Sequence, residues 1–305
     1  MKILLTANKT LPRNGIQIID ATYWSLYIPL LSMGHQVYFY DTVNPIEKDY
    51  LKVIDGFKPD IIFACLTGDP AITPFEPIDE IEGETKSGRT KTFNWFCDDG
   101  WRFDNFSSKI CWKFSCCSTP EAEFIPRYKE IGYDNIMLGI WHANLDLFPT
   151  ISRKAVDVGF CGYFNQQRTQ MFELMRGSGI NAIAKYGISY EDMLTFYSLS
   201  KIGINFSLGE NGRVSKTQLK QRVFEITAAK SLLLTGYHEG IEEFFEIDKE
   251  IVVFQSPEEM VSKIKFLLAH DDILNKISAA GHSRFVEEHE SKKRLGKILD
   301  KIVDL

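Results

Sequence analysis

The feature that most constrains the fold is an alternation of short apolar segments with helical stretches, which runs along the chain and then restarts. Between the apolar segments, hydrophobic residues recur at helical spacing. Strands joined through helices need crossover connections, and right-handed crossovers produce a parallel sheet covered on both faces. Strands are expected at residues 3–7, 36–40, 60–65 and 92–97, and again at 156–161, 182–186, 202–206, 231–235 and 250–254. We therefore predict an α/β protein with two Rossmann-like domains that face each other across a cleft.

The domain boundary is expected near residues 148–154, where the periodicity lapses and polar residues gather. A chain of 305 residues has the length of two domains of about 150 residues each. We predict an N-terminal domain over residues 1–150 and a C-terminal domain over residues 151–305. From residue 257 the pattern is helical to the end, and the last helix is a candidate to pack back on the first domain.

Composition narrows the class of protein. The chain is 44% hydrophobic and 25% charged, as in soluble globular proteins. Its net charge of −6 disfavours a nucleic-acid backbone as the main partner. No window approaches the ~18 apolar residues of a membrane span, and the apolar start is too short for a signal peptide. The six cysteines lack paired C-x-x-C spacing, so we expect reduced thiols and a cytoplasmic protein.

The most informative segment for function is residues 218–235, which predicts a loop with cationic side chains, a short helix and a buried strand. Lys220 and Arg222 lie near the expected helix start, where cations and helix N–H groups together can neutralise two phosphates. Glu225 follows on the same helix, and a carboxylate there can accept hydrogen bonds from both hydroxyls of a ribose. Capping of the helix or salt bridging to a neighbour is the alternative role for these residues.

Other candidate residues stand where predicted strands of the second half end. Gly162 follows the strand at 156–161, and a glycine there lets the backbone approach a phosphate closely. Arg168 opens the next helix and supplies a cation. Tyr186 with Gly187, and Asn205, end two further strands. Because carboxyl ends of parallel strands share one edge of a sheet, we expect these residues on one wall of the cleft.

In the first half, Asp98 and Asp99 are adjacent carboxylates at the end of a predicted strand. They are candidates to position an acceptor, that is, a substrate that receives a transferred group. Asp98 is also a candidate general base, and turn capping is the alternative role for both carboxylates. His142, at the hinge edge of the expected cleft, is a second candidate for catalysis, with a structural hinge role as the alternative. The loop with Asn14 and Gly15 is expected on the acceptor side.

Several chemistries lack their motifs. The histidines show neither an i,i+4 ligand pair nor H-E-x-x-H, so no metal site is expected. No Walker loop, no G-x-G-x-x-G after the first strand and no G-x-S-x-G elbow is present. The sequence therefore does not support ATP hydrolysis, NAD chemistry or a serine hydrolase, and we expect no cofactor.

The order of residues 218–235 resembles the donor-sugar segment of GT-B glycosyltransferases, in particular the CgeB-like branch. There, Arg, an apolar residue, Phe and Glu precede small residues and an apolar strand, as Arg222 to Glu225 do here. In the broad family-4 type a pair of Glu residues is usual; Glu225 matches the second, while Gln218 stands where we expect the first. The resemblance implies that Glu225 binds ribose, that Gly162 and Arg168 face the diphosphate or sugar, and that Tyr186 and Gly187 lie by the nucleobase.

This resemblance implies a metal-independent, retaining, hexosyltransferase-type enzyme that moves a sugar from a nucleotide-diphosphate sugar to a hydroxyl. The acceptor could be a glycan, a protein, a lipid, a small molecule or a modified nucleic acid. A nucleotide-sugar 2-epimerase shares the fold and is one alternative. A non-catalytic binding or assembly protein is the other, and Gln218 favours it because one carboxylate of the pair is missing.

Overall fold

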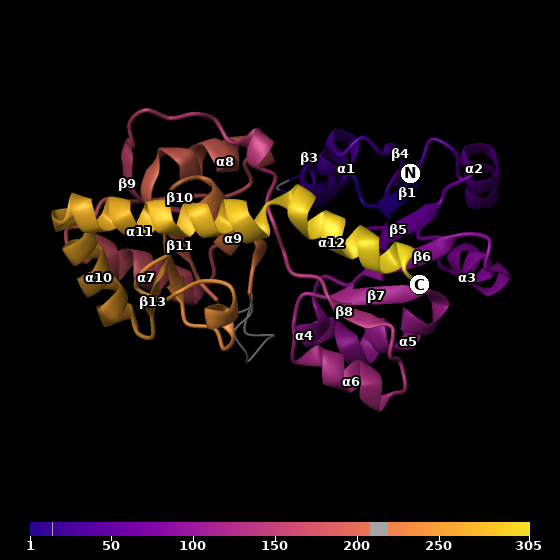
Figure 1. Cartoon of the computed structure of the whole chain (residues 1–305). Helices are drawn as coiled ribbons and strands as arrows, with labels where there is room; N and C mark the ends of the chain where they lie inside the picture. The colour runs from indigo at the N-terminus through magenta and orange to yellow at the C-terminus, as the bar shows by residue number, and fades with distance from the viewer. Residues whose placement is uncertain (14, 208–218) are drawn as a thin grey trace. The chain divides into compact units, whose positions relative to one another are not determined.

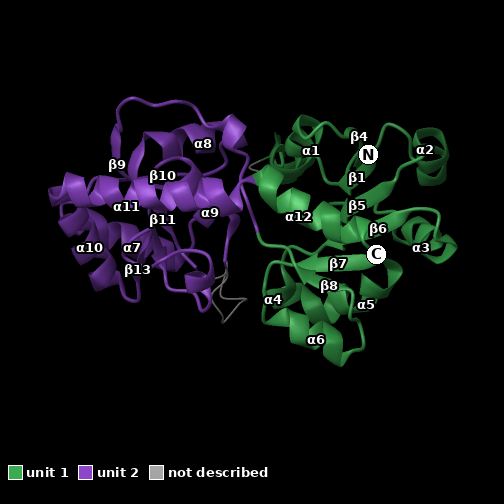
Figure 2. Ribbon diagram, viewed as in Figure 1, with its two compact units in different colours: residues 1–140, 291–305 green, residues 141–290 purple. Residues whose placement is uncertain are grey.

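The computed structural model describes residues 1–13, 15–207 and 219–305, which divide into two compact units (Figure 2). Unit 1 consists of Met1–Ile140 with Ser291–Leu305, and unit 2 of Trp141–Glu290. The sequence suggested a boundary at residue 150; in this division the first change of unit follows Ile140. The last helix, α12 (Ser291–Val303), belongs to unit 1, where it contacts β6 (Lys91–Trp95) and α1 (Ile28–Ser32).

Unit 1 contains a six-stranded sheet in the order β4-β1-β5-β6-β7-β8, and every neighbouring pair is parallel (Figure 1). Its remaining strands are β1 (Lys2–Ala7), β4 (Gln36–Asp41), β5 (Ile61–Cys65), β7 (Cys116–Thr119) and β8 (Ile136–Leu138). The sequence predicted the first four of the six. It did not predict β7 and β8, because they are short and β7 carries small side chains without an apolar run.

Helices α2 (Tyr50–Phe57), α3 (Ile78–Ser87), α5 (Ser108–Ile110) and α6 (Phe124–Glu130) share one apolar core with the sheet of unit 1. Residues 20–33 carry apolar side chains at helical spacing, and within them a π-helical turn, Tyr23–Tyr27, is followed by α1. The expected loop after the first strand instead forms an antiparallel hairpin of β2 (Thr10–Arg13) and β3 (Ile16–Ile19). Gly15, between these strands, has a φ of 76°, a conformation that glycine adopts without strain.

Unit 2 contains a five-stranded parallel sheet in the order β10-β9-β11-β12-β13. The strands are β9 (Val156–Cys161), β10 (Ala182–Lys185), β11 (Ser200–Asn205), β12 (Leu232–Gly236) and β13 (Val252–Phe254). Two parallel sheets confirm the predicted α/β class. After β10 the chain crosses back to the other side of β9, so the order of the strands reverses between β9 and β11. Ligands of open α/β sheets bind at the carboxyl ends of the strands at such a switch point.

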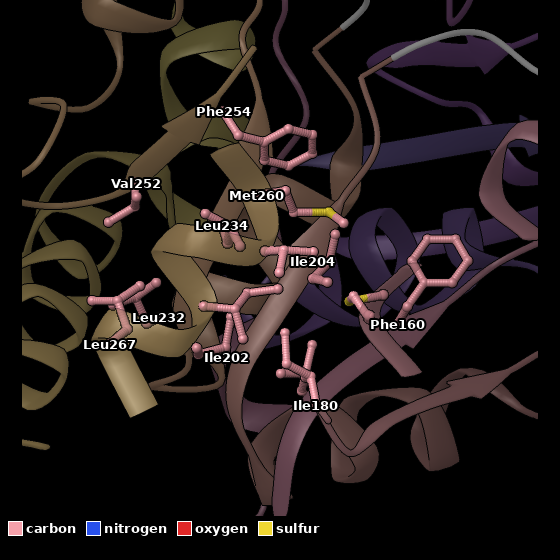
Figure 3. Close-up of a cluster of buried hydrophobic side chains, with 14 of the residues drawn as sticks. Phe160, Ile180, Ile202, Ile204, Leu232, Leu234, Val252, Phe254, Met260 and Leu267 are labelled. Atoms are coloured by element: carbon pink, nitrogen blue, oxygen red, sulfur yellow. The ribbon is translucent and has the colours of Figure 1, made fainter. Parts of the chain in front are cut away.

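Polar side chains cap several helices of unit 2. Asn165, Ser189 and Ser256 each accept a backbone N–H at the start of a helix. Unit 2 contains the helices α7 (Gln166–Gly177), α8 (Tyr190–Leu199), α9 (Gln221–Ala228), α10 (Pro257–Ala269) and α11 (Asp271–Arg284), of which α7, α8 and α10 have these caps. Aliphatic residues of the central strands, among them Ile202 and Leu232, form the core (Figure 3). Within the described residues, no helix combines the length and apolarity that crossing a membrane requires.

Candidate functional site

The turn after β9 lies at the switch point of the unit 2 sheet and leaves room for a cation. Gly162 in this turn has a φ of 157°, and a Cβ on it would lie 2.7 Å from Nη2 of Arg222 and 2.9 Å from Cζ of Phe160. Any side chain at this position would therefore displace the Arg222 guanidinium. Glycine allows the backbone after β9 and the cation on α9 to lie against each other.

Arg222, on the first turn of α9, is held by neighbours from two strands. Its Nη1 donates a hydrogen bond to Oδ1 of Asn205 at 3.3 Å, and its guanidinium lies 5.0 Å from the centre of the Phe160 ring. The Asn205 amide in turn donates to Oγ1 of Thr235 at 3.0 Å. Nε of Arg222 is buried and has no hydrogen-bond partner among the described residues. An unused buried donor of this kind points to a group that is bound there or to water.

Glu225 lies one helical turn after Arg222 and is 5% exposed. Burial raises the pKa of its carboxyl to about 7, although the Arg222 charge and a hydrogen bond with Tyr190 act in the opposite direction. Gln221, also on α9, donates weakly to the Tyr190 hydroxyl and to the carbonyl of His142, at 3.4 Å each. The carboxylate is therefore positioned by packing between α8 and α9.

Arg168 brings a second cation to the same edge of the sheet. Asn165 caps the start of α7 by accepting the Arg168 N–H at 2.9 Å, and Nη1 of Arg168 donates to the Tyr163 carbonyl at 2.6 Å. The guanidinium lies 5.5 Å from the Phe160 ring and 5.9 Å from the Phe206 ring. Phe160 thus has a guanidinium from α7 and one from α9 near its ring. Two cations near the switch point produce a positive potential that favours an anionic ligand.

Arg168 also lines a cavity of about 390 Å³ at the carboxyl ends of β11, β12 and β13. Aromatic rings from Phe206, Tyr237 and Phe254 form much of its wall, and Ser207 and Gln255 add polar groups. Arg222 and Glu225 are not among its lining residues.

An exposed aromatic pair lies beside the Gly162 turn. Tyr163 and Tyr186 are each 40% exposed, and their ring centres are 5.5 Å apart in an edge-to-face arrangement. Gly187 follows with a φ of 69°, so the turn after β10 uses the left-handed region that glycine tolerates. Exposed aromatic rings beside a candidate binding site can stack on a planar group of a ligand. We did not anticipate Tyr163 from the sequence, where its only signal is its place after Gly162.

The remaining second-half candidates are only partly described. Lys220 is the half-buried residue that precedes α9, and its backbone is extended. Gln218 lies outside the described residues. The structure thus brings Gly162, Asn205 and Arg222 together, with Glu225 on the adjoining helical turn.

In unit 1 the paired carboxylates have different environments. Asp99 is 1% exposed and accepts a hydrogen bond from the Tyr128 hydroxyl at 2.9 Å, and burial raises its pKa. Asp98, just before α4 (Asp99–Arg102), is partly exposed and lies 4.0 Å from Nε of Arg102. Asp98 is therefore the more accessible member of the pair.

Three further candidates come from the first half of the sequence. His142 belongs to unit 2 and is 1% exposed, so its ring is enclosed by protein. Gly15 lies in the exposed hairpin turn, while Asn14 falls outside the described residues. In the described part of the chain, no group of three or more His, Cys, Asp or Glu residues is arranged to hold a metal ion.

The second half of the chain is similar to a known protein family. Residues 160–300 match a family model described as glycosyl transferase-like. No curated protein matches the chain by sequence.

Solved structures show the fold of the whole chain to be the GT-B fold. A glycosyltransferase from Rickettsia africae is 11% identical, with 99% of this chain and 98% of that one covered and a TM-score of 0.66. HepE of Anabaena, in complex with UDP and glucose, is 10% identical over 100% of both chains, with a TM-score of 0.68. Sucrose-phosphate synthase from Thermosynechococcus elongatus is 9% identical over 99% of both chains, with a TM-score of 0.66.

Proposed function

We propose that this protein is a glycosyltransferase that moves a sugar from a nucleotide-diphosphate sugar to an acceptor hydroxyl. The observation that carries the proposal is the grouping of Gly162, Asn205, Arg222 and Glu225 at the switch point of the unit 2 sheet. The glycosyl transferase-like match covers these residues, and HepE, a structure with the same fold, is in complex with UDP and glucose. We further propose a hexosyltransferase of the CgeB-like branch that acts in the cytoplasm.

Each grouped residue has a part in this proposal. Arg222, with Lys220 and Arg168, neutralises the diphosphate, and the unused Nε of Arg222 is a donor for a phosphate oxygen. Glu225 accepts hydrogen bonds from the ribose hydroxyls, and Gly162 lets the phosphates approach the backbone. Because negative charge grows on the departing diphosphate, these cations stabilise the transition state more than the ground state.

The nucleobase stacks beside Tyr186 and Gly187 in this proposal, and Asn205 orients Arg222. In the reaction, the bond between the anomeric carbon and the diphosphate oxygen breaks and the acceptor oxygen bonds to that carbon. In a retaining enzyme the departing diphosphate takes the acceptor proton, without a metal or cofactor. In an inverting enzyme Asp98 or His142 is the base, and Asp98 is the more accessible of the two.

The first experiment measures nucleotide binding. We expect UDP, GDP, CDP or dTDP to raise the melting temperature of the protein, because a ligand that binds only the folded state stabilises it. Glu225→Ala should weaken the affinity for that nucleotide by about tenfold or more, since hydrogen bonds to a charged group are lost. The exposed Glu191→Ala on α8 is the matched control and should bind normally. Unchanged binding by Glu225→Ala would exclude the ribose role.

Product analysis separates the reactions that share this fold. Incubation with the stabilising nucleotide's sugar and a panel of hydroxyl acceptors should release the nucleoside diphosphate and form a glycoside, whose anomeric configuration NMR reads directly. Conversion of the free donor without acceptor would instead indicate a 2-epimerase. If no nucleotide stabilises the protein, both enzymatic functions are wrong and a non-catalytic role follows.

A further inference from the structure

A second cavity, of about 350 Å³, lies wholly within unit 1 between the end of β8 and helix α12. Residues 137–140 form one side, and Arg294, Lys297, Asp300 and Lys301 line the other. None of these residues belongs to the group proposed to bind the nucleotide. The site is distinct from the 390 Å³ cavity, which lies in unit 2.

The charge of α12 is opposite to that of the whole chain. Residues 291–303 contain five basic side chains and one acidic side chain, whereas the net charge of the protein is −6. The apolar face of the helix, with Leu295 and Leu299, is buried, so the cations lie on the remaining faces. Lys297 and Lys301 are exposed and one helical turn apart, a spacing at which like charges destabilise a helix. Neither lysine has an ion pair among the described residues, which leaves their charge available to an anion.

A buried hydroxyl lies behind the wall formed by β8. Ser118 is fully buried, and its Oγ has no hydrogen-bond partner among the described residues. A Cβ on Gly139, which lines the cavity, would overlap this oxygen. Glycine at position 139 therefore lets this part of the cavity wall pack against the hydroxyl.

We infer that this cavity is an anion site that binds a phosphate group carried by the acceptor. The identity of the ligand as an acceptor rests on the proposed function. The binding of a phosphate group in the cavity does not depend on it. A phosphate oxygen suits both the guanidinium of Arg294 and the ammonium groups of Lys297 and Lys301. Asp300 opposes these charges; three basic residues and one acidic residue line the cavity.

The test compares two charge reversals on one helix. Lys297→Glu with Lys301→Glu reverses two charges that line the cavity, and Lys292→Glu with Lys293→Glu makes the same change on α12 away from its lining. Inorganic phosphate, glucose 6-phosphate and glucose are titrated by calorimetry, and UDP binding is measured in each variant. We expect glucose 6-phosphate to bind wild type more tightly than glucose, and the cavity variant to lose at least about tenfold of that affinity. The control variant should retain it.

The other outcomes decide the remaining alternatives. Equal losses in both variants, or no preference for glucose 6-phosphate over glucose in wild type, would overturn the inference. Inorganic phosphate binding as tightly as glucose 6-phosphate would overturn the assignment to an acceptor. UDP binding should be unchanged in both variants, because the nucleotide residues lie in unit 2. If none of UDP, GDP, CDP and dTDP binds the wild type, the proposed function is rejected, while the anion site is left intact.

Discussion

At the scale of a single residue, Glu225 combines burial with a charge that the proposed function requires. Its pKa in the folded protein is about 7, above the ordinary value of 4.5. Between these two values the folded state binds more protons than the unfolded state, so the stability of the protein should fall as pH rises through this window. Above about pH 7 the carboxylate is ionised and its burial cost is fully present. The same ionised form is the better acceptor for two ribose hydroxyls.

Glu225→Gln tests this balance because it keeps the shape of the side chain and removes the charge. We expect the variant to exceed wild type in stability by up to about 3 kcal/mol at pH 8, and to differ little at pH 5. Urea unfolding at both pH values measures the difference. A constant difference across the two pH values would contradict the raised pKa. Nucleotide affinity should rise from pH 6 to pH 8 in wild type and stay level in the variant.

At the scale of elements, one lysine joins the ends of α8 and α9, the helices beside the proposed nucleotide site. Nζ of Lys154 donates to the carbonyl of Ser198 at 2.8 Å, the carbonyl of Ala229 at 3.1 Å and Oγ of Ser231 at 3.2 Å. These carbonyls lie at the carboxyl ends of α8 and α9, where backbone acceptors lack helical partners and a cation is favourable. Burial, and the charge of Lys230, lower the pKa of Lys154 to about 8.

Replacing this lysine should loosen unit 2. Lys154→Ala removes three hydrogen bonds from a half-buried position, and we expect a loss of about 2 kcal/mol in the free energy of unfolding. Arg153→Ala, an exposed neighbouring cation, is the control and should cost less than about 0.5 kcal/mol. Thermal or urea unfolding of both variants measures this. Equal losses would mean that surface charge, rather than the link between helix ends, accounts for the effect.

At the scale of the whole molecule, the two units differ in the candidate sites that they contain. Unit 2 has the cationic switch point at the edge of a five-stranded parallel sheet. Unit 1 has the partly exposed Asp98 and the cation-lined cavity beside α12. We infer that nucleotide chemistry belongs to unit 2 and acceptor binding to unit 1.

Hydrogen–deuterium exchange with and without the nucleotide tests this division. UDP, or whichever nucleotide stabilises the protein, should slow exchange in peptides that contain residues 160–163, 205–207 and 220–226 of unit 2. Peptides from β12 and β13, whose residues lie in the core, should change little. Protection confined to unit 1 would contradict the assignment.

Part of this organisation was predictable because it depends on local patterns. Apolar runs such as residues 202–206 and 231–235 predicted β11 and β12, and parallel strands place their ends at one edge. The shared edge of parallel strands, together with the cations expected at the start of the helix before β12, indicated Gly162, Asn205 and Arg222 as candidates for one site. The sequence did not predict β8, because this three-residue strand is defined by its pairing with β7 rather than by its own composition.

By itself, then, the sequence determined the α/β class, the two parallel sheets and the strand ends that carry the candidate residues, because periodicity and strand order are properties of the chain. Only the tertiary structure decided which side chains are enclosed. It buried Asp99 against Tyr128 while leaving Asp98 partly exposed, raised the pKa of Glu225 by packing, and set Ser118 behind Gly139. These outcomes depend on contacts between residues far apart in the chain, and no local pattern records the distance between them.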